Sequence, residues 1–196
     1  MSEGKLALVL HAHLPYVRSA EKGSLEEDWF FQALLECYLP LLKVLEDASQ
    51  SANQSPKLTI SLSPTLLSLF NDQDLKNRFP EWLGIRLKIL ADSQENEHLA
   101  AKELTSFIES QLSNWNSNKG DVIKRFSSLQ DQSVIDIITC AATHGYLPLL
   151  REYPQAVKGQ LKTAVREHFR VFGIKPKGIW LPECAYYEGL DGLLKE

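Results

Sequence analysis

The sequence predicts an α/β fold built on a parallel sheet, and three observations support this prediction. Four short apolar runs are typical of strands that are buried on both faces. Segments with helical periodicity fill the gaps between these runs, so the order alternates between strand and helix. Polar or Gly- and Pro-rich residues follow every run, where folds of this class place their chemistry. The predicted strands are Leu6–Leu10, Lys57–Leu62, Val134–Cys140 and Gly178–Leu181.

Helices are predicted in the gaps, over residues 26–48, 65–130 (two or more helices) and 154–172. Apolar residues at spacings of three and four predict the first helix, and Pro40 predicts an interruption in it. Ser63 and Pro64 together are a typical helix start. The Asn-rich stretch at 114–120 predicts a break between helices, and Gly173 predicts the end of the last one.

Composition excludes several classes of function. The 196 residues are 44% hydrophobic and 23% charged, with a net charge of −4 and no basic block, so no nucleic-acid partner is expected. No apolar run approaches the roughly 20 residues of a membrane span. The N-terminal residues lack the pattern of a signal peptide. With no CxxC pair, Cys37, Cys140 and Cys184 are expected to be free thiols, which predicts a cytoplasmic protein.

Histidines follow two of the predicted strands. His11 and His13 are two residues apart, so on a strand they share one face. That arrangement could bind a metal, could donate two hydrogen bonds to one ligand, or could be a satisfied pair at a strand end. His144 follows the third strand, whereas His98 and His168 lie in helical sequence and are expected at the surface.

One carboxylate stands directly at a strand end. Glu183 follows the fourth strand, with Trp180 and Tyr186 on either side. An aromatic ring beside a carboxylate suits carbohydrate, because rings stack on the apolar face of a sugar. The alternative is a structural glutamate in a turn. The acids at 26–28 instead precede a helix and are expected to face its dipole.

The thiols offer a weaker candidate. Cys184 and His144 could form a nucleophilic pair, although a buried and inert thiol is the simpler interpretation. The sequence contains no phosphate loop and no GxSxG motif.

The strand ends carry the motifs of a known family. The sequence resembles glycoside hydrolase family 57 and, within it, the 1,4-α-glucan branching enzymes. The matching segments are HAHLPYVR (11–18), EDWFFQALLECYLPLL (27–42), TISLSPTLL (59–67), ATHGYLPLL (142–150) and GIWLPECAYY (178–187). They run in family order over nearly the whole chain, and the last two favour the branching subgroup over the amylases.

The resemblance implies a fold, an activity and a set of site residues. The fold would be the N-terminal part of an incomplete (β/α)₇ TIM-like barrel, with residues 1–196 as a portion of the catalytic domain. The activity would be α-glucan transfer by a retaining double displacement, with no cofactor and no metal. Glu183 would be the nucleophile. The substrate-binding residues would be His11, His13, His144, Trp180 and Tyr16.

The sequence departs from the family in one respect. The family's general acid/base is an aspartate that lies later in a longer chain, and no motif after WLPECAY is present. Retaining chemistry needs two carboxylates about 5–5.5 Å apart. Asp191 and Glu188 are close to Glu183 in sequence, but neither matches a family position. The chain alone is therefore expected to be inactive.

Other functions stay open at this stage. Within the family they are an amylase or a 4-α-glucanotransferase. Outside it they are a metal-dependent polysaccharide deacetylase, whose Asp/His ligand set is not matched because Val9 and Leu10 precede His11, or a fragment that only binds glucan. A strand without its next neighbour would also favour association with the missing half or with a second copy.

Overall fold

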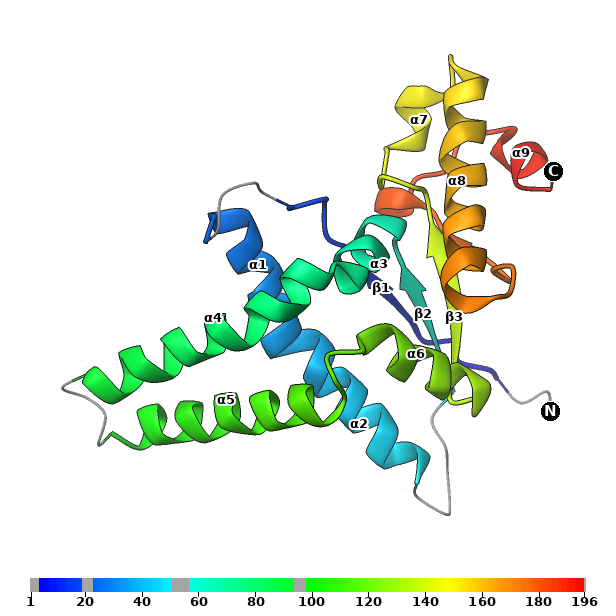
Figure 1. Ribbon diagram of the computed structural model, residues 1–196. Coiled ribbons are helices and arrows are strands. Elements are labelled where there is room, and N and C mark those ends of the chain that lie inside the picture. Colours follow the sequence, from blue (N-terminus) through cyan, green and yellow to red (C-terminus); the bar gives the residue numbers. More distant parts are fainter. Residues whose placement is uncertain (1–3, 19–22, 51–56, 94–97, 196) are drawn as a thin grey trace.

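A four-stranded parallel sheet lies at the centre of the described residues, which are 4–18, 23–50, 57–93 and 98–195 of a computed structural model. The strands stand in chain order, β1-β2-β3-β4, and every adjacent pair is parallel (Figure 1). All the carboxyl ends of the strands therefore meet at one edge of the sheet. The strands are β1 (Val9–Ala12), β2 (Leu58–Leu62), β3 (Ile135–Cys140) and β4 (Ile179–Trp180).

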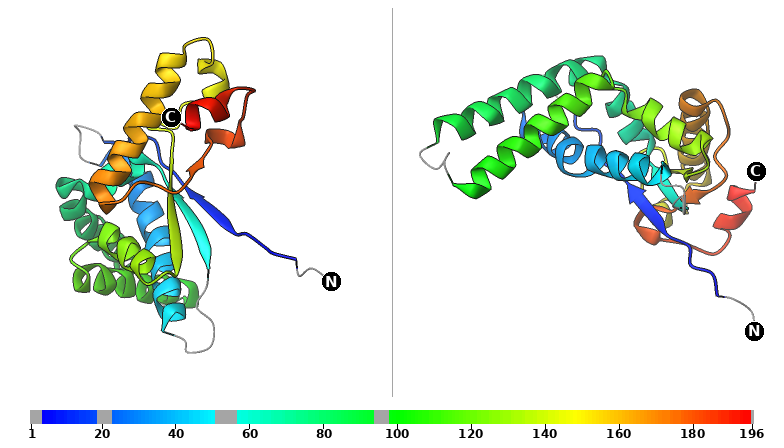
Figure 2. Two further views of the ribbon diagram at one scale, coloured as in Figure 1. Left: turned by 90° about the vertical axis from the view of Figure 1, so that its right-hand side faces the viewer. Right: turned by 90° about the horizontal axis from the view of Figure 1, so that it is seen from below.

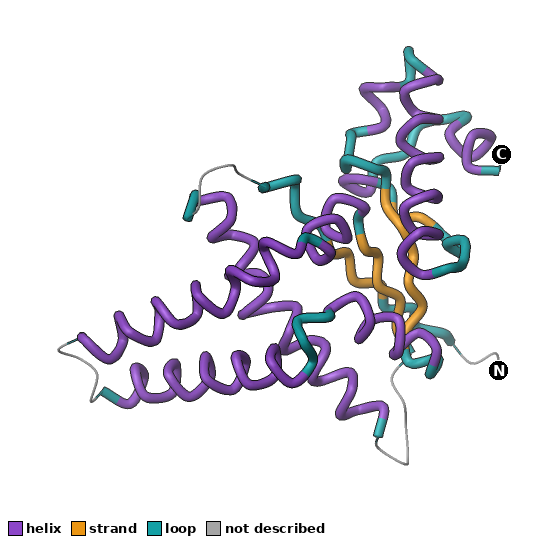
Figure 3. The backbone as a smooth tube through the Cα atoms, in the orientation of Figure 1, coloured by secondary structure: helices purple, strands orange, loops and turns teal. Residues whose placement is uncertain are grey.

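Helices occupy the connections between the strands, as the sequence predicts (Figure 3). Between β1 and β2 they are α1 (Leu25–Ala33), the π-helical turn η1 (Leu34–Tyr38) and α2 (Leu39–Ser49). Between β2 and β3 they are α3 (Pro64–Asn71), α4 (Gln73–Asp92), α5 (Leu99–Ser117) and α6 (Val122–Asp131). The remaining elements are α7 (Leu147–Leu150), α8 (Pro154–Phe172), the 3₁₀ turn η2 (Pro182–Cys184) and α9 (Leu190–Leu194).

Local sequence explains several of these boundaries. The π-helical turn η1 ends at Tyr38, two residues before Pro40, which lacks the N–H that a continuous α-helix would use. The predicted interruption is therefore found at this point. Ser63 caps α3 by accepting a hydrogen bond from the backbone N–H of Leu66. Gly173 ends α8 in the left-handed conformation, with a φ of 71°. Residues 94–97 of the predicted helical stretch lie outside the described residues.

The main core lies between the sheet and the helices of the first two connections, and a second, smaller cluster of buried residues lies around α7, α8 and α9. Helices α4 and α5 pair side by side and extend away from the sheet, while α6 and α8 lie along it (Figures 1 and 2). Their apolar faces bury large side chains, and each fully buried Leu or Phe contributes roughly 1.5–3 kcal/mol. The largest of them include Phe30, Leu42, Ile60, Leu66, Phe79 and Phe126.

The first strand begins later than the sequence predicts. Leu6 and Leu8 are exposed, and β1 starts at Val9, which pairs with Thr59 of β2. Apolar character alone does not make a strand, because a strand needs a partner, and the pairing of β1 with β2 begins only at Val9. The strand also ends later than predicted, at Ala12, and this brings His11 into the strand itself.

Helix α8 carries a residue that the sequence analysis placed wrongly. His168 was expected at the surface, but its side chain is fully buried, with its ring 4.9 Å from that of Phe172. It shares a helix face with Val157, Leu161 and Ala164, which are also buried. His98 is exposed, as predicted. None of the described helices is long and apolar enough to cross a membrane.

Candidate active site at the carboxyl ends of the strands

The parallel register places two short polar repeats side by side. His11 of β1 pairs with Ser61 of β2, and each is followed two residues later by a second polar residue, His13 and Ser63. Residues two apart on a strand share a face, so all four side chains lie on the same side of the sheet. His11 Nδ1 lies 3.2 Å from Ser61 Oγ, and His13 Nδ1 lies 2.9 Å from Ser63 Oγ. The serines hold both rings in place.

The tautomer of His11 follows from its partner. Ser61 Oγ donates its proton to the carbonyl oxygen of Thr139, at 3.2 Å. Ser61 must therefore accept from His11, so the proton of the His11 ring is on Nδ1. The lone pair on Nε2 then faces His144 Nε2, 3.0 Å away, which donates to it. A chain of hydrogen bonds thus runs from β3 through β2 and β1 to the loop after β3.

Four rings form one stack at this edge of the sheet. The ring centroids of His13 and His144 are 3.9 Å apart at an interplanar angle of 13°. Those of His11 and Trp180 are 5.4 Å apart at 16°. Trp180 is the last residue of β4, so strands from both ends of the sheet contribute to the stack. Flat, partly buried rings with nitrogen atoms at their edges can both stack on a sugar and bind its hydroxyl groups.

Burial keeps the two strand histidines neutral. Desolvation, followed by the nearby His144 and His11 rings, lowers the pKa of His13 to about 4. Desolvation also lowers the pKa of His11, with His144 adding to the effect and Glu183 opposing it. At neutral pH each ring therefore carries one donor and one acceptor nitrogen, and in the structure Ser61 and His144 are the partners of the two nitrogens of His11.

Glu183 stands at the mouth of this cluster. It lies in η2 immediately after β4, and its Oε1 is 3.7 Å from His144 Nδ1. Its side chain is 69% exposed, whereas that of His144 is 11% exposed. Glu183, Cys184 and His144 all have φ values of 56–57°, in the left-handed region that residues with a Cβ avoid. The turn aims an accessible carboxylate at a ring that is nearly buried.

The remaining predicted residues are placed differently. Tyr16 is 62% exposed, four residues beyond the end of β1. Cys184 is exposed, so the prediction of a buried thiol at this position is wrong. Asp191 accepts a hydrogen bond from Tyr186 Oη at 3.2 Å and lies 3.6 Å from Lys195 Nζ. Its carboxylate is engaged with these two side chains.

Sequence reasoning missed three members of the cluster. Ser61 and Ser63 are fully buried, and their period-two spacing at the end of β2 repeats that of the histidines, which is a signal that the sequence contains. Cys140, the last residue of β3, is also fully buried, and burial raises the pKa of its thiol to about 12. A ligand atom from each of His11, His144 and Cys140 lies within 4.8 Å of the others.

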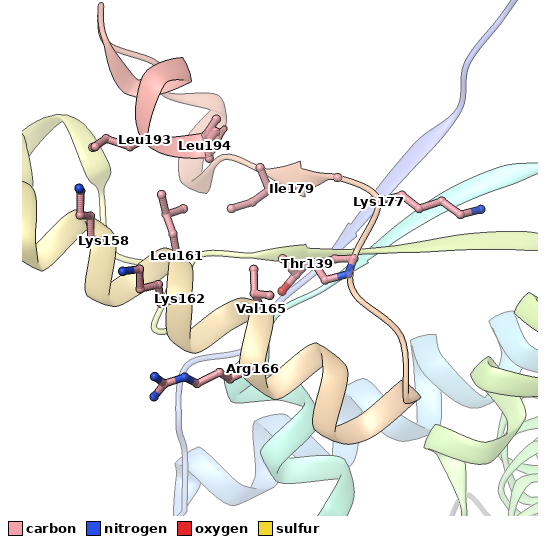
Figure 4. Close-up of a pocket in the computed structure, with 12 residues that line it drawn as sticks. Thr139, Lys158, Leu161, Lys162, Val165, Arg166, Lys177, Ile179, Leu193 and Leu194 are labelled. Atoms are coloured by element: carbon pink, nitrogen blue, oxygen red, sulfur yellow. The ribbon is translucent and has the colours of Figure 1, made fainter. Parts of the chain in front are cut away.

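A separate pocket of about 540 Å³ lies between α8, β4 and α9 (Figure 4). Leu161 and Val165 line it from α8, Ile179 from β4, and Leu193 and Leu194 from α9. None of the residues of the histidine cluster lines it. The candidate chemistry is therefore at the strand ends and not in this apolar pocket.

Comparison with known proteins identifies the class of protein that this fold and site define. The sequence model of glycosyl hydrolase family 57 matches residues 7–196, and the chain therefore belongs to glycosyl hydrolase family 57. The chain is similar to the 1,4-alpha-glucan branching enzyme TK1436 of Thermococcus kodakarensis, with 37% identity over 187 residues. That match covers 94% of this chain but only 27% of the relative.

Solved structures agree with this assignment. The GH57-type branching enzyme of Pyrococcus horikoshii superimposes with a TM-score of 0.87 and 37% identity, over 93% of this chain and 35% of that one. The alpha-amylase AmyC of Thermotoga maritima superimposes with a TM-score of 0.89 and 33% identity, over 99% of this chain and 38% of that one. The predicted fold is confirmed: four parallel strands with their helices match the N-terminal part of a TIM-like barrel.

Proposed function

We propose that this chain supplies the nucleophile and the sugar-binding histidines of a retaining 1,4-α-glucan branching enzyme. The observation that carries the proposal is the position of Glu183, an accessible carboxylate 3.7 Å from His144 at the strand ends. Glu183 attacks the anomeric carbon of the donor glucan. A bond forms between its carboxylate oxygen and that carbon while the glycosidic bond breaks, which gives a covalent glycosyl intermediate.

The stack of rings binds the donor sugar next to the point of cleavage. His13, neutral at working pH, exchanges hydrogen bonds with sugar hydroxyls, and His11 does so once a hydroxyl group replaces His144 as the partner of its Nε2. Trp180 shapes the same pocket. His144, once protonated, forms an ion pair with the Glu183 carboxylate and holds it toward the sugar. Tyr16 stays a proposed contact, and its exposure supports a place at the outer part of the subsite.

The general acid lies outside this chain in our proposal. Retaining enzymes place it about 5–5.5 Å from the nucleophile. Asp191 is engaged with Tyr186 and Lys195, which argues against it as the substitute. The chain spans 27% of the length of the Thermococcus branching enzyme, and this supports residues 1–196 as the N-terminal portion of a larger catalytic domain. We propose that the portion alone does not transfer glucan.

Transfer and hydrolysis differ in what attacks the intermediate. A hydroxyl group of a second glucan gives a branch, whereas water gives hydrolysis. The similarity to branching enzymes favours transfer, and so does the sequence of the HGYLPLL and WLPECAY segments. The similarity to AmyC keeps amylase activity as the second candidate. Family membership leaves the deacetylase alternative without support.

The proposed setting is the synthesis of a glycogen-like α-glucan in the cytoplasm. The three free cysteines, Cys37, Cys140 and Cys184, favour a reducing compartment. The acidic net charge of −4 favours a neutral polymer over nucleic acid as the partner. No cofactor is required by the double displacement, because the nucleophile and the acid are both side chains.

Branching of amylose tests the proposal. The test uses a protein that contains this chain and has the full length of its relatives. It is incubated with amylose and then treated with a debranching enzyme, and the reducing ends that this treatment releases count the new branch points. We expect branches from the intact protein and a loss of several orders of magnitude with Glu183→Gln. Glu188→Gln, an exposed neighbour, is the matched control and should keep full activity. Free maltose without branch points would favour the amylase alternative.

A further inference from the structure

The loop that follows β1 is fixed at its start by two contacts with the first residues of α3. His13 Nδ1 lies 2.9 Å from Ser63 Oγ, the cap of that helix. The carbonyl oxygen of Leu14 accepts a hydrogen bond of 2.8 Å from Thr65 Oγ1, and the Leu14 side chain packs against the main core. The first two residues after the strand are therefore held in place.

The far end of the loop is fixed by Arg18. Its Nε donates to the Asp72 carboxylate at 3.0 Å, and its Nη2 donates to the Asp74 carboxylate at 2.8 Å. Its Nη1 lies 3.6 Å from the Glu27 carboxylate. Val17, directly before it, is buried in the main core. The guanidinium group thus joins the loop to the start of α4 and to α1.

Two of these acceptors are themselves held by further contacts. Asp72 caps α4, since its Oδ1 accepts from two backbone N–H groups of the first turn at 2.9 and 3.0 Å, while its Oδ2 accepts from Arg18. Glu27 is buried and makes two hydrogen bonds of 2.6 Å with Arg78. The anchor for Arg18 is therefore part of the packed structure.

Only Pro15 and Tyr16 lie between the two fixed ends of the loop. The ring of Pro15 fixes its own φ, which further limits the shapes that the loop can take. The Tyr16 side chain is 62% exposed, so the backbone on either side, and not burial of the ring, sets its position. A ring that already stands in place binds a ligand without the cost of ordering its loop.

We propose that Arg18 is a positioning residue for glucan binding, which acts by holding the exposed ring of Tyr16 toward the substrate. The inference rests on the proposed function, in which Glu183 attacks the donor sugar and Tyr16 contacts the outer part of the subsite. The ring stacks on the apolar face of a glucose unit that is not itself cleaved. Arg18 therefore contributes to the affinity for the glucan chain and not to the breaking of its bond.

A double-mutant cycle tests this in a protein that contains this chain and has the full length of its relatives. Tyr16→Ala and Arg18→Met should each raise the KM for amylose about five- to tenfold and leave kcat within about twofold. In the Tyr16→Ala background, Arg18→Met should raise KM by less than about twofold more, because Arg18 acts through that ring. Fully additive increases in KM would overturn the proposal, and so would a fall in kcat with KM unchanged.

Conservative variants separate the bracing from the general stability of the protein. Asp72→Asn keeps the cap of α4, because Asn caps a helix as well as Asp does, but it removes the carboxylate that Arg18 uses. We expect it to raise KM about two- to fivefold. Arg18→Lys should restore part of the affinity lost in Arg18→Met, since an ammonium group cannot reproduce the guanidinium fork. Arg170→Met, which breaks an exposed pair with Glu167, is the matched control and should leave KM unchanged.

Limited proteolysis tests the bracing without any measurement of activity. Chymotrypsin cuts after an exposed tyrosine only where the surrounding loop opens locally. We expect residues 1–196 to be cut after Tyr16 at least tenfold faster in Arg18→Met than in the parent chain, with the site located by mass spectrometry. Phe126→Leu, which weakens the core elsewhere, controls for a general loss of stability and should not favour this cut. Equal cutting of the parent and Arg18→Met would overturn the bracing, whereas faster cutting supports it even if the full-length protein forms no branches, a result that would overturn the proposed function instead.

Discussion

His144 and Glu183 face each other across the strand ends, with His144 Nδ1 3.7 Å from Glu183 Oε1, and both residues have left-handed backbone conformations. A left-handed conformation costs a residue with a Cβ roughly 1–2 kcal/mol. Such strain persists only where the surrounding structure holds it, and it concentrates at functional sites. Here it directs the carboxylate and the ring toward the same point.

Relief of this strain next to Glu183, the proposed nucleophile, should stabilise the protein. Cys184 is exposed and has a φ of 56°, so Cys184→Gly removes the steric cost and loses little packing. We expect the free energy of unfolding to rise by about 0.5–1 kcal/mol in urea titrations. Ala185→Gly is the matched control, because Ala185 is extended, with a φ of −94°. It should destabilise by about 0.5–1 kcal/mol. Equal effects at the two positions would contradict the account of strain.

The ion pair between Glu27 and Arg78 should be essential for stability. Two hydrogen bonds of 2.6 Å join them, and both side chains are almost fully buried. Glu27→Gln leaves the buried Arg78 charge with only the exposed Asp74 carboxylate, 3.4 Å away. We expect a loss of about 3–5 kcal/mol in the free energy of unfolding. Asp47→Asn breaks the exposed pair with Lys43 and should cost less than about 1 kcal/mol. Similar losses from the two variants would contradict this ranking.

His168 should make the protein sensitive to acid. Burial lowers its pKa to about 4, and neither ring nitrogen has a hydrogen-bond partner among the described residues. The unfolded chain binds a proton near pH 6.5, whereas the folded chain does not until about pH 4. The resulting stability is complete above pH 6.5 and is lost as the pH falls toward 4, by about 3 kcal/mol. His168→Leu should flatten the difference between urea titrations at pH 7 and pH 4.5. An unchanged pH dependence would contradict the assignment.

The two edges of the sheet should make this chain associate. Within the described residues β1 and β4 each have one strand neighbour. Leu8, just before β1, and Val9, its first residue, are exposed. Unpaired strand edges template association with other chains. Light scattering should give a mass that rises with concentration, and Leu8→Lys should lower that mass. A constant monomer mass at every concentration would show that neither edge of the sheet mediates association.

The sequence predicted the four strands and the alternation because short apolar runs and punctuating residues are local signals. It placed the first strand three residues too early, because the chain is apolar at Leu6 and Leu8 whether or not a partner strand is there. Pairing is a property of two segments, so one segment cannot fix it. The helix that starts at Pro64 was predictable because its cap and its proline are adjacent in sequence.

Prediction of the site from the sequence was limited in the same way. His11, His13, His144 and Glu183 each follow a predicted strand, so their gathering at one edge was predictable from topology. The position of Cys140 near His11 was not predictable, because it depends on which strand lies between β1 and β3. His168 was judged by its charged neighbours, although its spacing from Val157, Leu161 and Ala164 already indicated the buried face of a helix.

The role of Glu183 as nucleophile is the central claim, and a covalent trap tests it most directly. A glucosyl fluoride with a second fluorine on the sugar ring slows breakdown of the intermediate. Its fluoride leaves without a general acid, so the test does not depend on a second carboxylate. Peptide mass spectrometry then locates the sugar. We predict one fluoroglucosyl group on Glu183, none on the Glu183→Gln protein, and unchanged labelling of Glu188→Gln. A sugar attached to any other residue, or equal labelling of the Glu183→Gln protein, would contradict the claim.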